Sequence, residues 1–190
     1  MSAAPAPVAA LQIRSAVPGD LTTVQAIYAH HVLHGTASFE IEPPEIAEMQ
    51  QRYAKVVGVG LPFLVAEIEG IVVGYGYAGS YRPRPAYLFT VEDSIYIHPE
   101  WCGRGLGRQL LARVIGNCEA AGRRQMIAVI GDSANVASVR LHAAAGFREA
   151  GVLRSVGFKF GRWLDTVLMQ RPLGPGADVL PVGKASPILP

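Results

Sequence analysis

The segment SIYIHPEWCGRGLGRQLL, Ser94–Leu111, joins a β-branched and aromatic run to the start of an apolar-periodic helix. The run ends at Pro99, and Gly103, Gly105 and Gly107 follow at alternate positions. Glycines at a strand-to-helix junction let the backbone approach a ligand, and the first N–H groups of a helix have no partners within it. Because the helix dipole is positive at the same end, the junction predicts an anion site.

The spacing of these glycines excludes two common phosphate sites. A dinucleotide-binding fingerprint reads G-x-G-x-x-G, but Arg108 stands where its third glycine belongs. A nucleotide P-loop ends in G-K-[ST], whereas this turn ends in Gly107-Arg108-Gln109. On these residues alone, a plain turn whose glycines only supply positive φ remains an alternative.

The composition describes one globular domain. The chain has 190 residues, half of them hydrophobic and only 17% charged, against about 25% charged in an average domain. A disordered chain or a coiled coil is therefore disfavoured. The net charge is +2, with no dense run of Lys or Arg, so we expect no nucleic-acid partner.

The two cysteines, Cys102 and Cys118, are too few for a disulfide framework and lack zinc-site spacing. We interpret them as reduced thiols of a cytoplasmic protein. The first residues lack the basic segment and continuous apolar run of a signal peptide. No stretch approaches the roughly 18 apolar residues of a membrane span, so we expect no membrane partner.

Hydrophobic periodicity predicts a single domain over residues 11–173, between a flexible tail at 1–10 and a Pro-rich tail at 174–190. The run QMIAVI is almost wholly apolar, which predicts a strand buried on both faces. The expected strands are 11–17, a hairpin over 62–80, 90–97, 125–130 and two between 147 and 171, and the expected helices are 20–31, 44–56, 105–121 and 135–145.

The resulting order, β-α-α-β-β-β-α-β-α-β-β, combines hairpins with strand–helix–strand crossovers. This combination predicts an α+β (α/β) fold, with a mixed sheet and helices on its faces. It also argues against a Rossmann domain, in which strands and helices alternate regularly.

With its surroundings, the segment resembles the acetyl-CoA site of the GNAT superfamily of N-acetyltransferases, whose signature [QR]-x-x-G-x-[GA] opens a helix. Gly105-Leu106-Gly107 match its G-x-G part. The resemblance covers about Ile13–Leu173. It is closer at TASFEIEPP, YAGSYRPRPAY, TVEDSIYI, NVASVRLHAAAGF and GFKFGRWLD, which resemble the phosphinothricin/methionine sulfoximine acetyltransferase branch. The family implies a mostly antiparallel sheet of about seven strands, acetyl-CoA as co-substrate and a homodimer.

The resemblance also implies the contacts of acetyl-CoA. The pantetheine arm would pair with the backbone of a free strand edge, and the pyrophosphate would lie on the glycine turn. Cys102 departs from the signature, which has Gln or Arg there, and a thiol cannot supply their contact; Arg104 or Arg108 would compensate. The implied cofactor-binding residues are Ile95, Tyr96, Ile97, Gly103, Arg104, Gly105, Leu106, Gly107, Arg108, Asn135 and Ser138, with an ordinary helix cap still open for Asn135.

Acetyl transfer requires a neutral amine, and model α-amino groups with pKa values of about 7.7–8.0 are largely protonated at neutral pH. A positioned base is therefore expected. Strand alternation places Glu92, Ser94 and Tyr96 on one face of their strand, and the related branch has a glutamate at the position of Glu92. We predict Glu92 as the base and Asp93 as its alternative; a solvated strand-end acid remains open.

His142 lies two helical turns after Asn135, on the same helix face. The related branch has a histidine here, which implies that His142 protonates the departing thiolate; Tyr96 is a second candidate donor. A purely structural histidine is the alternative.

Two arginines in the loop YRPRPAY, Arg82 and Arg84, suit the carboxylate of an amino acid. The related branch uses cationic residues of this loop, which favours that role; two solvated loop arginines are the alternative. The resemblance adds Phe39 as a pocket residue and Lys159 with Trp163 as residues that close the pocket. It implies acetylation of the α-amine of a glutamate- or methionine-like amino acid, such as phosphinothricin, methionine sulfoximine or methionine sulfone.

Two other functions remain open on sequence grounds. One is acetylation of protein N-termini or lysines, and the other is a catalytically inactive acyl-CoA-binding regulator. A metal site is not expected: His30 and His34 share a helix face, but no third ligand or H-E-x-x-H pattern accompanies them.

Overall fold

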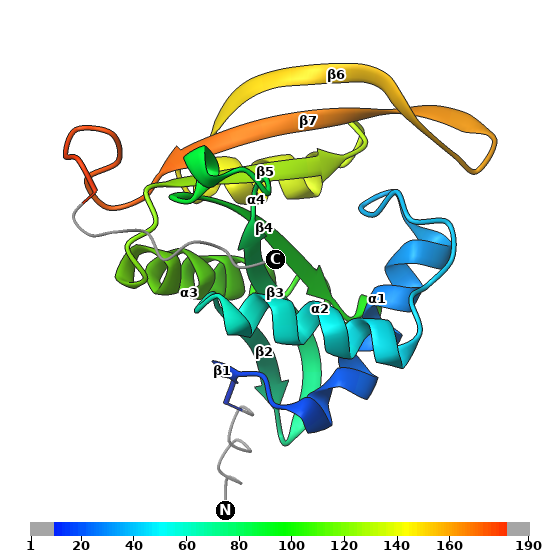
Figure 1. The fold of residues 1–190 in the computed structure, drawn as a ribbon. Coiled ribbons are helices and arrows are strands. Elements are labelled where there is room, and N and C mark those ends of the chain that lie inside the picture. Colours follow the sequence, from blue (N-terminus) through cyan, green and yellow to red (C-terminus); the bar gives the residue numbers. More distant parts are fainter. Residues whose placement is uncertain (1–9, 182–190) are drawn as a thin grey trace, which may run out of the picture.

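The computed structural model describes residues 10–181, which form a seven-stranded sheet flanked by helices (Figure 1). The strand order is β1-β2-β3-β4-β5-β7-β6, and every neighbouring pair is antiparallel except β4 and β5. The predicted element order and the mixed, mostly antiparallel sheet are thus confirmed. The strands are β1 Gln12–Ser15, β2 Phe63–Ile68, β3 Ile71–Ser80, β4 Thr90–Ile97, β5 Gln125–Gly131, β6 Arg148–Lys159 and β7 Arg162–Pro172, and the helices are α1 Leu21–His34, α2 Ile46–Gly58, α3 Leu106–Ala120 and α4 Val136–Ala144.

The helices cover both faces of the sheet, and the side chains of β4 alternate between them. On one face, the Tyr96 ring packs edge-on against Tyr28 of α1, with 5.0 Å between centroids. On the other face, Asp93 bonds His142 of α4, and the side chain of Val114 on α3 lies over Gly76 of β3. Because side chains alternate along β4, this strand makes an aromatic contact with the helix on one face and a carboxylate–histidine contact with the helix on the other.

The sheet splays apart between its two central strands. The parallel pairing of β4 with β5 runs from Thr90–Gln125 to Asp93–Ala128 and stops there. Beyond this point, β4 continues to Ile97 and β5 to Gly131. The free strand edge that the sequence predicts therefore follows Asp93, and a ligand can reach the interior of the sheet there.

The expectation of a strand buried on both faces at residues 125–130 is wrong for one face. Val129 is 39% exposed, because it follows the last residue of β5 that pairs with β4 and lines the cavity between the strands. One face of this apolar strand therefore packs in the core, and the other face lines the cavity.

The predicted tails fall largely outside the described residues, at 1–9 and 182–190. The beginning of the C-terminal tail is ordered as a turn on the domain, since the Gly174 N–H donates to Glu119 Oε1 and the Gly176 N–H to the Leu173 carbonyl. Among the helices of residues 10–181, none is long and apolar enough to cross a bilayer.

Candidate active site

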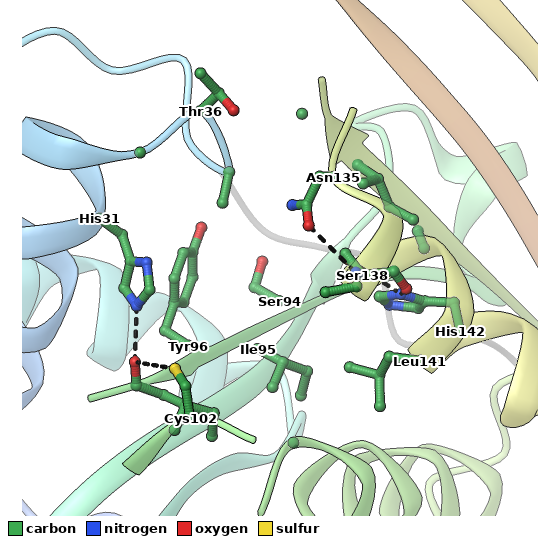
Figure 2. A pocket seen from close by; sticks show the side chains of 18 of the residues that line it. His31, Thr36, Ser94, Ile95, Tyr96, Cys102, Asn135, Ser138, Leu141 and His142 are labelled. Carbon is green, nitrogen blue, oxygen red and sulfur yellow. Dashed lines mark hydrogen bonds between the residues drawn. The ribbon is translucent and has the colours of Figure 1, made fainter. Parts of the chain in front are cut away.

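A cavity of about 730 Å³ lies at the splay between β4 and β5 (Figure 2). Its walls come from the second half of β4, the end of β5, the first turns of α3 and α4, and the loop that follows α1. Most of the predicted cofactor residues line it together: Ile95, Tyr96, Ile97, Gly103, Gly105, Leu106, Gly107, Arg108, Asn135 and Ser138.

The backbone of β4 offers hydrogen-bonding groups to this cavity. His98 N–H donates to the Val73 carbonyl of β3, so the even-numbered residues of β4 bond to β3. By antiparallel alternation, the N–H and C=O groups of Ile95 and Ile97 point the other way, toward the splay. His31 of α1 bonds the Ile97 carbonyl through Nε2 at 2.8 Å. An extended ligand is therefore able to pair with this edge as an added strand would.

The glycine turn has the backbone that the sequence predicts. Gly103 and Gly105 have φ values of 75° and 79°, a region that favours glycine, and Gly105 precedes the first residue of α3. The N–H groups of that first turn have no partners within the helix. Together with the helix dipole they form an anion site at the mouth of the cavity.

The two arginines of the turn lie differently. Arg108 lines the cavity. Arg104 does not line it; its guanidinium stacks on the Trp101 ring at 4.5 Å and donates to the Glu100 carbonyl. Only Arg108 is thus placed to compensate for Cys102, whose thiol lies 3.7 Å from the His98 carbonyl and has its pKa raised by burial.

Asn135 caps α4, as the structural alternative supposes, and also lines the cavity. Its Oδ1 accepts from the Ser138 N–H at 3.2 Å, and Figure 2 shows its amide directed into the cavity. One side chain thus combines a helix cap with a group that can bond a ligand.

Of the three predicted catalytic residues, Glu92 and Tyr96 belong to the same face of β4, and His142 contacts Asp93 on the other face. Tyr96 and His142 line the cavity, whereas Glu92 does not. Burial raises the pKa of Glu92, the charge of Asp93 raises it further, and the charge of Arg82 lowers it. Burial also holds the pKa of Tyr96 well above its ordinary value, so its phenol stays protonated and able to donate.

His142 is held by a buried partner that the sequence prediction missed. Its Nε2 lies 2.9 Å from Asp93 Oδ2, and its Nδ1 lies 2.8 Å from the Ser138 carbonyl. Burial lowers the pKa of His142, but the hydrogen bond and charge of Asp93 outweigh it, and the pKa is raised. No sequence pattern links two residues 49 positions apart; only the placement of α4 over β4 does.

Lys159 anchors the loop between α1 and α2 and does not line the cavity. Its ammonium donates to the carbonyls of Gly35 at 3.0 Å and Ser38 at 2.8 Å, and burial lowers its pKa. Phe39 of the same loop lies between Gly131 of β5 and Gly157 of β6. The two residues predicted to line and close the pocket therefore fasten this loop across the splay.

Trp163 does not close the pocket. It is 64% exposed and packs edge-on against Phe158, its cross-strand partner on the β6–β7 hairpin. Successive side chains in a strand point to opposite faces of the sheet. Since Lys159 points inward, its neighbour Phe158 points outward.

Arg82 and Arg84 lie on an exposed loop before β4. Of the two, Arg82 has its charge close enough to Glu92 to lower the pKa of that carboxyl group. Among the described residues, no group of three or more His, Cys, Asp or Glu side chains is placed to hold a metal ion.

Comparisons with known proteins identify the family of this fold. The model of the acetyltransferase (GNAT) family matches residues 25–147. The chain belongs to this family. It is 59% identical over 172 residues to a phosphinothricin N-acetyltransferase from Alcaligenes faecalis, covering 90% of this chain and 87% of that one.

Two further relatives extend the comparison. The chain is 39% identical to an L-methionine sulfoximine/L-methionine sulfone acetyltransferase from Salmonella typhimurium, over 86% of this chain and 95% of the other. The crystal structure of a GNAT superfamily phosphinothricin acetyltransferase from Sinorhizobium meliloti, in complex with AcCoA, superposes with a TM-score of 0.90. That pair is 48% identical and covers 93% of this chain and 96% of the other.

Proposed function

We propose that the protein transfers the acetyl group of acetyl-CoA to the α-amine of a small glutamate- or methionine-like amino acid. Phosphinothricin, methionine sulfoximine and methionine sulfone are the acceptors that the names of its relatives support. The observation that carries the proposal is the splay after Asp93 and Ala128, where a free strand edge leads from a glycine turn into the sheet.

The proposed cofactor contacts follow the walls of the cavity. The turn from Gly103 to Arg108 binds the pyrophosphate through backbone N–H groups and one guanidinium. The backbone groups of Ile95 and Ile97 bond the pantetheine amides, and Asn135 on α4 adds an amide contact. This arrangement directs the thioester toward the residues where β4 and β5 part.

Glu92 is the proposed base. Its carboxylate takes a proton from the acceptor's ammonium group, directly or through a water, and the neutral amine then attacks the thioester carbonyl. The raised pKa brings Glu92 nearer to the operating pH, which suits proton transfer. Glu92 passes this first proton to solvent and takes the second proton from the nitrogen as the C–N bond forms. The C–S bond then breaks, and the sulfur leaves with the electron pair.

Arg82 and Arg84 are the proposed partners of the acceptor's carboxylate. The effect of Arg82 on the pKa of Glu92 supports this role, because it brings a guanidinium near the proposed base. Phe39 and Lys159 act on the acceptor site through the loop that they hold.

We further propose that the protein is a cytoplasmic homodimer. The supply of acetyl-CoA favours the cytoplasm. The β6–β7 hairpin exposes the large apolar side chains of Val156, Phe158, Phe160 and Trp163, a concentration that is typical of an interaction surface. Size-exclusion chromatography with light scattering tests the dimer, and Trp163→Glu should shift it toward monomer.

A thiol-release assay with the purified protein tests the function. Acetyl-CoA is combined with amino acids and their sulfone, sulfoximine and phosphinate analogues, and with peptides bearing free N-termini or lysines. CoA release with methionine sulfone or phosphinothricin supports the proposal. CoA release with peptides but not with amino acids would show that the acceptors are protein N-termini or lysines. Tight binding of acetyl-CoA without CoA release would indicate a regulator.

A further inference from the structure

Asp93 and His142 form a buried charged pair where β4 and β5 part. Their side chains are 1% and 7% exposed, and the contact between Oδ2 and Nε2 is 2.9 Å long. Both residues line the cavity. Burying a carboxylate is costly unless a cation or strong donors compensate, so the protonation state of the histidine decides what this pair does.

The hydrogen bonds of the ring fix its protons. Nδ1 lies 2.8 Å from the Ser138 carbonyl, which only accepts, whereas the Ser138 hydroxyl is farther away at 3.4 Å. Nδ1 therefore carries a proton. Nε2 faces a carboxylate that also only accepts when ionised. When Asp93 is ionised, both ring nitrogens donate in this geometry, and the ring that fits it is an imidazolium.

Of the described residues that line the cavity, Arg108 and Arg162 are also cationic. Arg108 lies at the glycine turn, and Arg162 is paired with Asp132 at 2.6 Å. Cys118 of α3 lies near Asp93, and burial raises the pKa of its thiol to about 12, so it stays neutral. Glu92 is adjacent on β4 but faces the other layer. The Phe147 ring meets His142 edge-on at 5.0 Å. The imidazolium is therefore the cation that contacts Asp93 in this wall of the cavity.

The pair lies at the inner end of the proposed cofactor path. Asp93 is the last residue of β4 that pairs with β5. From Ile97 to Asp93 the strand advances about 13 Å, at roughly 3.3 Å per residue. An extended arm that enters at the glycine turn and follows this edge brings its far end beside the pair.

We propose that Asp93 is a positioning residue that keeps His142 as a fixed imidazolium beside the thioester sulfur, and that His142 stabilises the departing thiolate by charge. Its two N–H bonds stay on Asp93 and Ser138, so no proton moves from His142 to sulfur. The two protons that the acceptor's ammonium loses leave in turn through Glu92 to solvent, and CoA leaves as the thiolate and takes one proton from water. This refines the prediction of His142 as an acid and rests on the proposed function for the position of the sulfur.

The first test is the titration of His142 without any CoA. Histidine-labelled protein is followed by NMR from pH 5 to 9, and His142→Gln identifies the resonance. In the wild type, His142 should titrate above the ordinary value of about 6.5. Asp93→Asn should lower its midpoint by about 1 to 3 pH units, the effect of removing a neighbouring opposite charge. Cys118→Ala is the matched control and should leave it in place; an unmoved midpoint in Asp93→Asn would overturn the proposal.

The second test asks whether the charge faces the sulfur. The affinities of CoA and of S-methyl-CoA, which has no ionisable thiol, are compared from pH 6 to 9. In the wild type, the preference for CoA should rise with pH below the midpoint of His142, by up to about tenfold per unit, the limit for one linked proton, and should level off above that midpoint. Asp93→Asn should lose this rise.

His142→Gln provides the same comparison if Asp93→Asn does not fold, because its neutral amide can bond both Asp93 and the Ser138 carbonyl. It too should lose the rise. A pH-independent preference in the wild type would overturn the proposal. If neither compound bound the wild type, the proposed function would fail and this role with it, and the titration measured without CoA would distinguish that failure from an uncharged histidine.

Discussion

The ring of Phe39 fills the space that a side chain at Gly157 would need: a Cβ on Gly157 would lie 2.3 Å from Cε2 of Phe39. On the other side of the ring, a Cβ on Gly131 would lie 3.0 Å from Cε1. The two glycines form a slot on β5 and β6 that receives the loop between α1 and α2. This loop therefore spans the splay, from the helix that contacts β4 to the far half of the sheet.

Replacing Gly157 with Ala should force Phe39 out of the slot. Overpacking of this kind typically costs about 1 to 3 kcal/mol, which lowers the Tm of a chain of this size by roughly 2 to 12 °C. The KM for the acceptor should rise, while the Kd for CoA should change little. Gly79→Ala is the control for stability, because a Cβ there meets nothing within 4 Å. An equal loss of Tm in both variants would contradict the slot.

Lys159→Met should remove the bonds to the Gly35 and Ser38 carbonyls and a buried positive charge. Between the lowered pKa of folded Lys159 and about 10.4 in the unfolded chain, the unfolded state binds more protons. The wild type should therefore gain stability relative to Lys159→Met as the pH rises through this window. Urea unfolding from pH 7 to 10 measures the difference.

The exposed Lys55→Met is the matched control for Lys159→Met and should show a smaller pH-dependent difference. A constant difference between the wild type and Lys159→Met over the same range would mean that burial does not perturb Lys159.

The sequence predicted those features that depend on short-range pattern. Periodicity located the helices and strands, the glycine spacing located the anion turn, and strand alternation separated Glu92 from Asp93. The missed features are contacts between distant elements. Lys159 meets a loop more than 120 residues away, and His142 meets Asp93 across 49. Such partners depend on how elements cross in space, which local pattern does not encode.

The two arginines of the glycine turn should differ in their effect on CoA binding. Arg108 lines the cavity, whereas Arg104 is held on Trp101. A hydrogen bond to a charged group contributes about 1.5 to 3 kcal/mol, so Arg108→Ala should weaken CoA binding by roughly ten- to a hundredfold. Arg104→Ala should change it by less than Arg108→Ala. Calorimetry with CoA measures both, and a larger loss in Arg104→Ala would show that the pyrophosphate binds outside the cavity.

The pH dependence of turnover should report Glu92. Because burial and the charge of Asp93 raise its pKa, kcat at saturating acceptor should fall on the acid side at a pH above the ordinary glutamate value of about 4.3. Glu92→Gln should remove this limb and lower kcat by about 10²- to 10⁴-fold, the usual effect of losing a general base. Since the charge of Arg82 lowers the same pKa, Arg82→Ala should move the limb to higher pH, and Arg84→Ala should move it less. Both arginine variants are measured with one acceptor, so the ionisation of the free amine is common to them. An acid limb that stays in place in Glu92→Gln would assign the base to another group.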